Sequence, residues 1–141
     1  MRALRVESEG IEDVNEFLKS IELLESGEGM SVLALDEDAV FGEDQIRAAV
    51  MHAERNFSKG KNVARDLKTE IMRYIACERQ IKSALEKAGI KKGTRGFVLV
   101  LLNSADEERV LKALGLKKSG FISQKRDKVD EALESMALLE L

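Results

Sequence analysis

A cluster of positively charged residues in the middle of the chain is the strongest chemical signal in the sequence. The cluster consists of Lys59, Lys61, Arg65, Lys68, Arg73 and Arg79. Such cations could neutralise the phosphates of an anionic ligand, and the free N–H groups at the start of a nearby helix would add positive potential. A solvated face whose charges pair with neighbouring carboxylates is the alternative. The residue pattern leaves both readings open.

The helices that would carry these cations are expected to meet near Cys77. Apolar residues at helical spacing predict one helix from Asn62, its N-cap, to about Cys77, and another from about Arg79 to Gly89. The helical phase changes between them, so Arg79 should return beside the end of the first helix. A plain helix–helix corner is the alternative.

The first of these helices should present its cations away from its apolar stripe. Arg65, Lys68 and Arg73 lie outside the arc that its apolar residues occupy. Glu70 lies close to that arc, and we expect it to orient one of the arginines rather than to perform acid–base chemistry.

No catalytic or metal-binding constellation is recognisable. His52 falls to one side of the apolar stripe of its helix, where a solvated or flanking side chain is expected. Cys77 has neither a second Cys nor a His nearby in sequence, so a thiol nucleophile would need His52 to arrive through the fold. The segment SGEGMS at 26–31 lacks the order of a phosphate-binding loop. The sequence thus predicts no catalytic residue, no metal and no cofactor.

Methionines on helix faces that should be exposed to solvent are candidates for a protein contact. Met51 lies off the apolar stripe of its helix, and Met72 falls among charged residues. Met is an adaptable contact residue, although single exposed apolar side chains are normal. Met51, Met72 and Met136, the last in the terminal apolar helix, are the predicted partner-binding residues.

The remaining elements predict an α/β or α+β fold, with a small mixed or antiparallel sheet packed with about six helices. Apolar or β-rich runs at 2–6, 31–35 and 97–102 predict strands, and the last, apolar throughout, suits a strand buried on both faces. Helical patterns cover 11–24 and 43–57, a capping box at 104–107 opens a helix that Gly115 closes, and a final helix begins at about Arg126.

Length and charge limit the class of protein. The 141 residues are expected to form a single domain, and the net charge of −3 excludes a strongly basic protein that coats nucleic acid. The N-terminal residues lack the apolar core of a signal peptide, and no apolar run is long enough to span a membrane. A cytoplasmic protein is expected.

The middle of the chain resembles the small kinase-binding subunit of the KEOPS tRNA-modification complex, the family that includes the PRPK-binding protein. The resemblance rests on residues 45–90, QIRAAVMHAERNFSKGKNVARDLKTEIMRYIACERQIKSALEKAGI. Its central signature is LKTEIMRYI followed by ERQI, AL and G. The chain departs from the family pattern at Cys77, where that pattern has Gly.

This resemblance implies a non-catalytic subunit that binds the small atypical kinase of the complex, which in turn touches the subunit that transfers the threonylcarbamoyl group. It also implies recruitment of tRNA through the single-stranded 3′ CCA end, which offers phosphates and unstacked bases. Lys59, Lys61, Arg65 and Lys68 would then contact phosphates, Arg73 and Arg79 phosphates or bases, and Asn62 would cap the helix or make a polar contact. A kinase-binding regulator without RNA contact is the alternative, and a thiol enzyme using Cys77 is a third.

Overall fold

An antiparallel β-sheet collects the three apolar runs of the sequence. The computed structural model describes residues 1–103 and 106–141, apart from the side chain of Glu28. The described strands are β1 (Arg2–Glu7), β2 (Val32–Asp36), β3 (Gly96–Leu101) and β4 (Lys117–Lys118), in the spatial order β2-β3-β1-β4 with every pairing antiparallel. The expected strands are confirmed. The two lysines of β4 carry no strand signal, so that strand was not predicted.

The described residues form two compact units. Residues 1–36 and 90–122 make up the unit that contains the sheet, here called the sheet unit, and residues 37–89 and 123–141 make up a helical unit. The chain therefore passes between the units after Asp36, after Gly89 and after Ile122. The antiparallel sheet and the separate helices confirm an α+β fold, while the expectation of a single domain over 1–141 stays a prediction.

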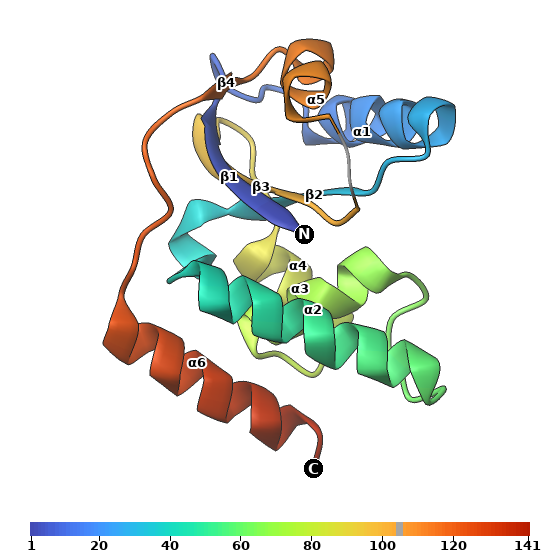
Figure 1. Cartoon of the computed structure of the whole chain (residues 1–141), viewed down its shortest axis with the longest axis vertical. Coiled ribbons are helices and arrows are strands. Elements are labelled where there is room, and N and C mark those ends of the chain that lie inside the picture. The colour runs from blue at the N-terminus through green and yellow to red at the C-terminus, as the bar shows by residue number, and fades with distance from the viewer. Residues whose placement is uncertain (104–105) are drawn as a thin grey trace. The chain divides into compact units, whose positions relative to one another are not determined.

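One face of the sheet packs against two helices of its own unit, α1 (Val14–Glu28) and α5 (Glu107–Leu114) (Figure 1). Side chains alternate between the faces of a strand, so Phe97, Leu99 and Leu101 of β3 all enter this core. The ring of Phe17 meets that of Phe97 edge to face, with centroids 5.7 Å apart. Every residue from Phe97 to Leu101 is buried, as the uninterrupted apolar run predicts.

The ends of α5 agree only in part with the sequence prediction. Ser104 and Ala105 of the predicted capping box lie outside the described residues. Within them the N-cap is Asp106, whose carboxylate accepts a hydrogen bond from the backbone N–H of Arg109. Gly115 ends the helix in the left-handed conformation, with φ of 67°, as expected.

The helical unit contains α2 (Glu43–Ser58), α3 (Leu67–Ala76), α4 (Ile81–Ala88), α6 (Arg126–Leu139) and the short 3-10 helix η1 (Glu37–Ala39). Helices α2, α3 and α6 contact one another, and α4 packs against α3. Ala49 and Ala53 of α2 are completely buried, and their small side chains allow the neighbouring helices to approach closely. Gln45 is also completely buried, and its amide bonds the backbone of Phe41, Ala39 and Ile75.

The start of α3 differs from the prediction. Asn62 does not cap the helix, since its side-chain amide donates to the carbonyl of Ala64 at 2.8 Å. The N-cap is Asp66, which accepts from the backbone N–H of Thr69 at 2.8 Å. Residues 63–66 are therefore a bend before the helix, and Arg65 lies in that bend. No helix in the described residues is long and apolar enough to cross a membrane.

Candidate functional site

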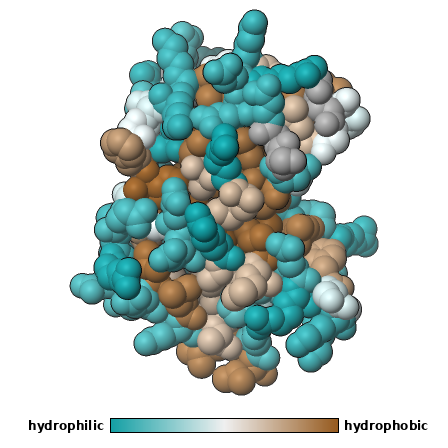
Figure 2. Space-filling view, viewed as in Figure 1, coloured by the Kyte–Doolittle hydropathy of each residue, from teal (hydrophilic) through white to brown (hydrophobic). Residues whose placement is uncertain are grey.

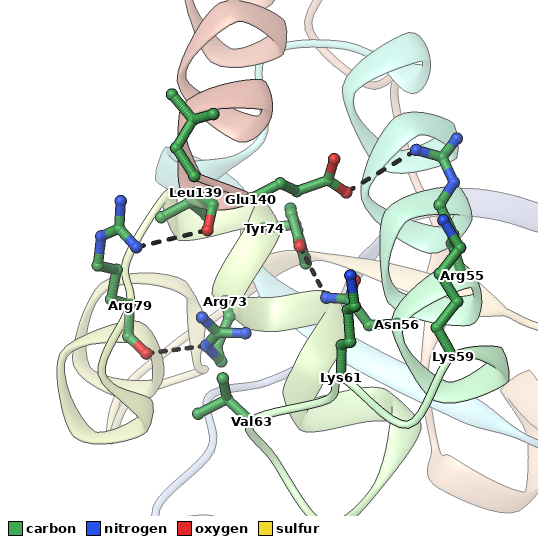
Figure 3. A pocket seen from close by; sticks show the side chains of 11 residues that line it. Arg55, Asn56, Lys59, Lys61, Val63, Arg73, Tyr74, Arg79, Leu139 and Glu140 are labelled. Carbon is green, nitrogen blue, oxygen red and sulfur yellow. Dashed lines mark hydrogen bonds and ion pairs between the residues drawn. The ribbon is translucent and has the colours of Figure 1, made fainter.

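A pocket of about 410 Å³ in the helical unit is lined by several cationic side chains (Figure 3). Its walls come from the end of α2, the segment that follows, α3, the α3–α4 turn and the end of α6. Five cationic side chains and one acidic side chain line it. The lining residues are Arg55, Asn56, Lys59, Lys61, Val63, Arg73, Tyr74, Arg79, Leu139, Glu140 and Leu141.

The predicted cationic cluster is only partly gathered here. Lys59, Lys61, Arg73 and Arg79 line the pocket. Asn62, Arg65 and Lys68 are not among its lining residues. The helical projection placed Arg65 and Lys68 on one helix with Arg73, but Arg65 precedes the helix, so the three do not form one stripe. The cluster of cations that could bind an anion is therefore smaller than predicted, and it lies between α2 and α3.

Glu70, which is not itself a lining residue, fixes several residues around the pocket. Its carboxylate is completely buried and accepts hydrogen bonds from the backbone N–H groups of Val63 at 3.2 Å and Ala64 at 3.0 Å. It also accepts from the side chains of Asn56 at 3.0 Å and Arg73 at 2.9 Å. One side chain thus fixes the segment before α3, a residue of α2 and the arginine one turn later. The expectation that Glu70 orients an arginine is confirmed.

Arg73 is not on the exposed face where the sequence placed it. Its exposure is 3%, and its guanidinium donates to Glu70 and, through Nε, to the carbonyl of Arg79 at 2.9 Å. The helical projection was wrong here because it treated every cation as solvated, whereas a buried carboxylate one turn away compensates this one. Arg73 therefore lines the pocket as part of a neutral pair.

The same network sets the ionisation of Glu70. Burial alone would raise the pKa of this carboxyl, but hydrogen bonds from the backbone of Ala64, from Asn56 and Arg73 and from the backbone of Val63 together lower it below its ordinary value. Glu70 is therefore ionised at neutral pH and keeps Arg73 paired.

The α3–α4 turn returns Arg79 to the pocket, as the change of helical phase predicts. Cys77 ends α3 in the left-handed conformation, with φ of 53°. The Arg79 guanidinium then donates to the carbonyls of Leu138 at 3.1 Å and Leu139 at 3.5 Å at the end of α6 (Figure 3). Gly adopts this backbone conformation at the least cost, so Cys77 carries a conformational penalty that a Gly would avoid.

The two candidate catalytic side chains have structural roles. The ring of His52 stacks on that of Tyr74 with centroids 4.9 Å apart, so the expectation of a solvated His52 is wrong and that of a flanking one is right. Burial raises the pKa of the Cys77 thiol, the opposite of what a nucleophilic thiol needs. Within the described ranges no group of His, Cys, Asp or Glu side chains could hold a metal ion.

Two lysines of the pocket are not held in a direct ion pair with any residue that the structure describes. Lys59 and Lys61 are exposed, and neither forms an ion pair with a carboxylate in the described part of the chain. By contrast, Arg55 lies 3.8 Å from Glu140, and Arg73 is paired with Glu70. Free positive charge is thus concentrated just after α2.

Several lining residues were missed by the sequence reasoning. Arg55 lies one helical turn before Lys59, so the spacing could have indicated it. Tyr74 belongs by spacing to the apolar stripe of α3, yet its hydroxyl accepts from Asn56 at 2.7 Å beside the pocket. Glu140 and the end of α6 carry no local signal, because only the tertiary fold brings them to α2.

The predicted partner-binding methionines differ in accessibility. Met51 on α2 is 53% exposed, and Met72 on α3 is half-buried. Met136 is completely buried and packs inside the helical unit, so the prediction that it contacts a partner at the surface is wrong. The periodicity of α6 had already placed it on the apolar stripe, which is the physical reason for its burial.

Comparison with known proteins gives two matches. A family model described as kinase binding protein CGI-121 matches residues 9–137. A curated relative from Pyrococcus abyssi (strain GE5 / Orsay), the KEOPS complex subunit Cgi121, is 29% identical over 101 residues, which cover 69% of this chain and 58% of the relative. The match therefore spans less than two thirds of the relative's length.

Proposed function

The chain belongs to the family of the kinase-binding protein CGI-121, and on that premise we propose that it is a non-catalytic accessory subunit of a KEOPS complex. In this role it binds the small atypical kinase of the complex in the cytoplasm and recruits tRNA through the single-stranded 3′ CCA end. It thereby supports threonylcarbamoyladenosine modification of the tRNA. The Pyrococcus relative, named as a KEOPS subunit, supports the assignment to this complex.

The pocket in the helical unit is the observation that carries RNA recruitment. On a chain of net charge −3, it gathers five cations, of which Lys59 and Lys61 are free of ion pairs with described residues. Single-stranded RNA is held by cations that follow its backbone and by planar groups that stack on its bases. His52 already covers one face of the buried Tyr74 ring, so the exposed guanidinium of Arg79 is the better stacking surface.

We expect tRNA binding to depend on both the CCA end and the two free lysines. Labelled tRNA with and without CCA should be titrated with the protein at several salt concentrations. Loss of binding on CCA removal is the expected result. The Lys59→Glu/Lys61→Glu variant should bind at least about tenfold more weakly, and its salt slope should fall by about 1.4, because each single-strand phosphate contact contributes about 0.7.

The matched control reverses the same number of charges elsewhere. Lys82→Glu/Lys92→Glu changes two exposed lysines that do not line the pocket. It should keep most of the affinity and the salt slope. Equal losses in both double variants would mean that only net charge matters and would reject the pocket. Arg73→Glu is unsuitable as a test, since it would place a second carboxylate beside buried Glu70.

A kinase-binding regulator without RNA contact is the second candidate, favoured by one observation. Three of the five pocket cations already have partners inside the protein: Arg55 has Glu140, Arg73 has Glu70, and Arg79 has carbonyls of α6. No binding of CCA-bearing tRNA even at low salt would favour this candidate.

Kinase binding is assigned to the α2 face that carries Met51. Figure 2 shows hydrophobic residues interspersed with hydrophilic ones over the helical unit, and Met51 is 53% exposed. We expect Met51→Glu to weaken the complex with the co-expressed KEOPS kinase at least about tenfold, since burying an unpaired charge opposes association. Leu23→Glu on α1, where Leu23 is 74% exposed, is the control. Equal affinity of the two variants, measured by calorimetry, would remove Met51 from the interface.

A further inference from the structure

A row of cationic or protonatable groups faces a carboxylate of the same chain at the pocket. Arg55 and Lys59 of this row line the pocket, whereas His52 does not. His52, Arg55 and Lys59 lie at positions i, i+3 and i+7 of α2 and its C-cap, which places them along one side of the helix. Glu140 approaches this row from the end of α6. Its Oε1 lies 2.6 Å from Nδ1 of His52. The same oxygen lies 3.8 Å from a terminal nitrogen of Arg55 (Figure 3).

The row acts on Glu140 as an anion site acts on its ligand. The hydrogen bond with His52 lowers the pKa of this carboxyl, and the charges of His52, Arg55 and Lys59 act in the same direction. Glu140 is therefore ionised at neutral pH. It is the one acidic side chain among the lining residues, and it occupies the position that an external anion would take.

We propose that His52, Arg55 and Lys59 form a phosphate subsite, and that the Glu140 carboxylate occupies this subsite until a ligand phosphate displaces it. The inference deepens the proposed function and rests on it for the identity of the ligand, a phosphate of single-stranded RNA. It assigns the α2 side of the pocket to the phosphate and leaves Arg79, on the opposite wall, for the base.

Displacement from Arg55 is feasible because the Arg55–Glu140 pair is accessible, whereas the His52 side chain is only 13% exposed. The Glu140 side chain is 32% exposed and that of Arg55 43%, so water and a ligand can reach both. Exposed ion pairs are weak, and a phosphate can replace their bonds with similar ones. Phosphate binding requires the Glu140 carboxylate to move away, and this carboxylate also repels the incoming phosphate. Removing the carboxylate should therefore tighten anion binding.

The test compares Glu140→Gln with the wild type, using two probes. The first is inorganic pyrophosphate, which needs no RNA-specific contact, and the second is a labelled oligonucleotide ending in CCA. Glu140→Gln should bind each probe roughly five- to tenfold more tightly than the wild type, from loss of one competing ion pair and one repulsive charge. Glu134→Gln, an exposed position on α6 outside the pocket, controls for the change in net charge.

A measurement on the wild type makes the test independent of any variant. His52 is the only histidine of the chain, so its ring signals in NMR spectra are assigned without ambiguity. Pyrophosphate should shift these signals to saturation as the bond with Glu140 is exchanged for one with phosphate.

The outcomes separate the subsite from the proposed function. If Glu140→Gln, but not Glu134→Gln, binds pyrophosphate more tightly than the wild type, the subsite is supported. This holds even if tRNA binding does not depend on the CCA end. That second result would instead reject RNA recruitment. The subsite is overturned by equal affinities of Glu140→Gln and Glu134→Gln, by His52 signals that do not move, or by the absence of pyrophosphate binding.

Discussion

Glu70→Ala should lower the free energy of unfolding by about 3–5 kcal/mol, the largest effect expected of any single substitution considered for this chain. The substitution would leave Arg73, only 3% exposed, without its buried counter-charge. It would also leave the backbone N–H groups of Val63 and Ala64 without their acceptor. Urea unfolding followed by circular dichroism measures the change.

Two further variants show whether the charge pair is the cause. Glu86→Ala removes an exposed glutamate from α4 and should change stability by less than about 0.5 kcal/mol. Glu70→Gln/Arg73→Met replaces both charges and should be more stable than Glu70→Ala, because no uncompensated charge remains. A loss below about 1 kcal/mol in Glu70→Ala would show that the pair does not organise the helical unit.

The same carboxylate makes stability depend on pH in a defined direction. The pKa of Glu70 is lowered in the folded state from an ordinary value of 4.5, so folding favours the ionised form. Its contribution is complete above pH 4.5 and is lost as the pH falls through the folded-state pKa. Between neutral and acidic pH, the wild type should therefore lose more stability than Glu70→Ala does.

Gly89→Ala is expected to destabilise the protein by about 2 kcal/mol or more, the second large effect. Gly89 follows α4, and its backbone N–H donates to the carbonyl of Leu85 at 2.9 Å. A Cβ built at this glycine would lie 2.5 Å from the same carbonyl oxygen, so the backbone would have to move. With φ of −76°, Gly89 is required by this close approach and not by a left-handed conformation.

Gly27→Ala is the matched control and should have the opposite sign. Gly27 lies within α1, and a Cβ there would meet nothing within 4 Å. Ala is a better helix former than Gly by roughly 0.5–1 kcal/mol, so this variant should unfold at a higher temperature than the wild type. If both alanines shift the midpoint in the same direction, the steric argument at Gly89 fails.

Periodic patterns account for most of the fold that the sequence predicted. Regular spacing of apolar residues identified α2 and α6, and the uninterrupted run at 97–102 identified β3. Spacing alone does not identify the N-cap of a helix when two residues near its start could both serve. Asn62 and Asp66 are both good N-caps, and only the bonds that Glu70 makes to the bend at 63–66 select Asp66.

The candidate site was predictable only where its residues are close in sequence. Lys59, Lys61 and Arg79 were found from charge and from the change of helical phase, and each lines the pocket. The burial of Arg73 and the arrival of Glu140 depend on tertiary contacts, which helical projection ignores. Sequence therefore indicated four of the five cations that line the pocket, but not which of them are already paired.

The division of the helical unit into two segments affects how the pocket forms on the ribosome. Residues 37–89 are synthesised before residues 90–122 of the sheet unit, and the wall that carries Glu140 is synthesised after both. A nascent chain that has not yet released α6 leaves exposed the surface that Val129, Ala132 and Met136 later cover. The pocket is therefore completed only when α6 packs, and until then the apolar surface beneath α6 is exposed to solvent and prone to aggregation.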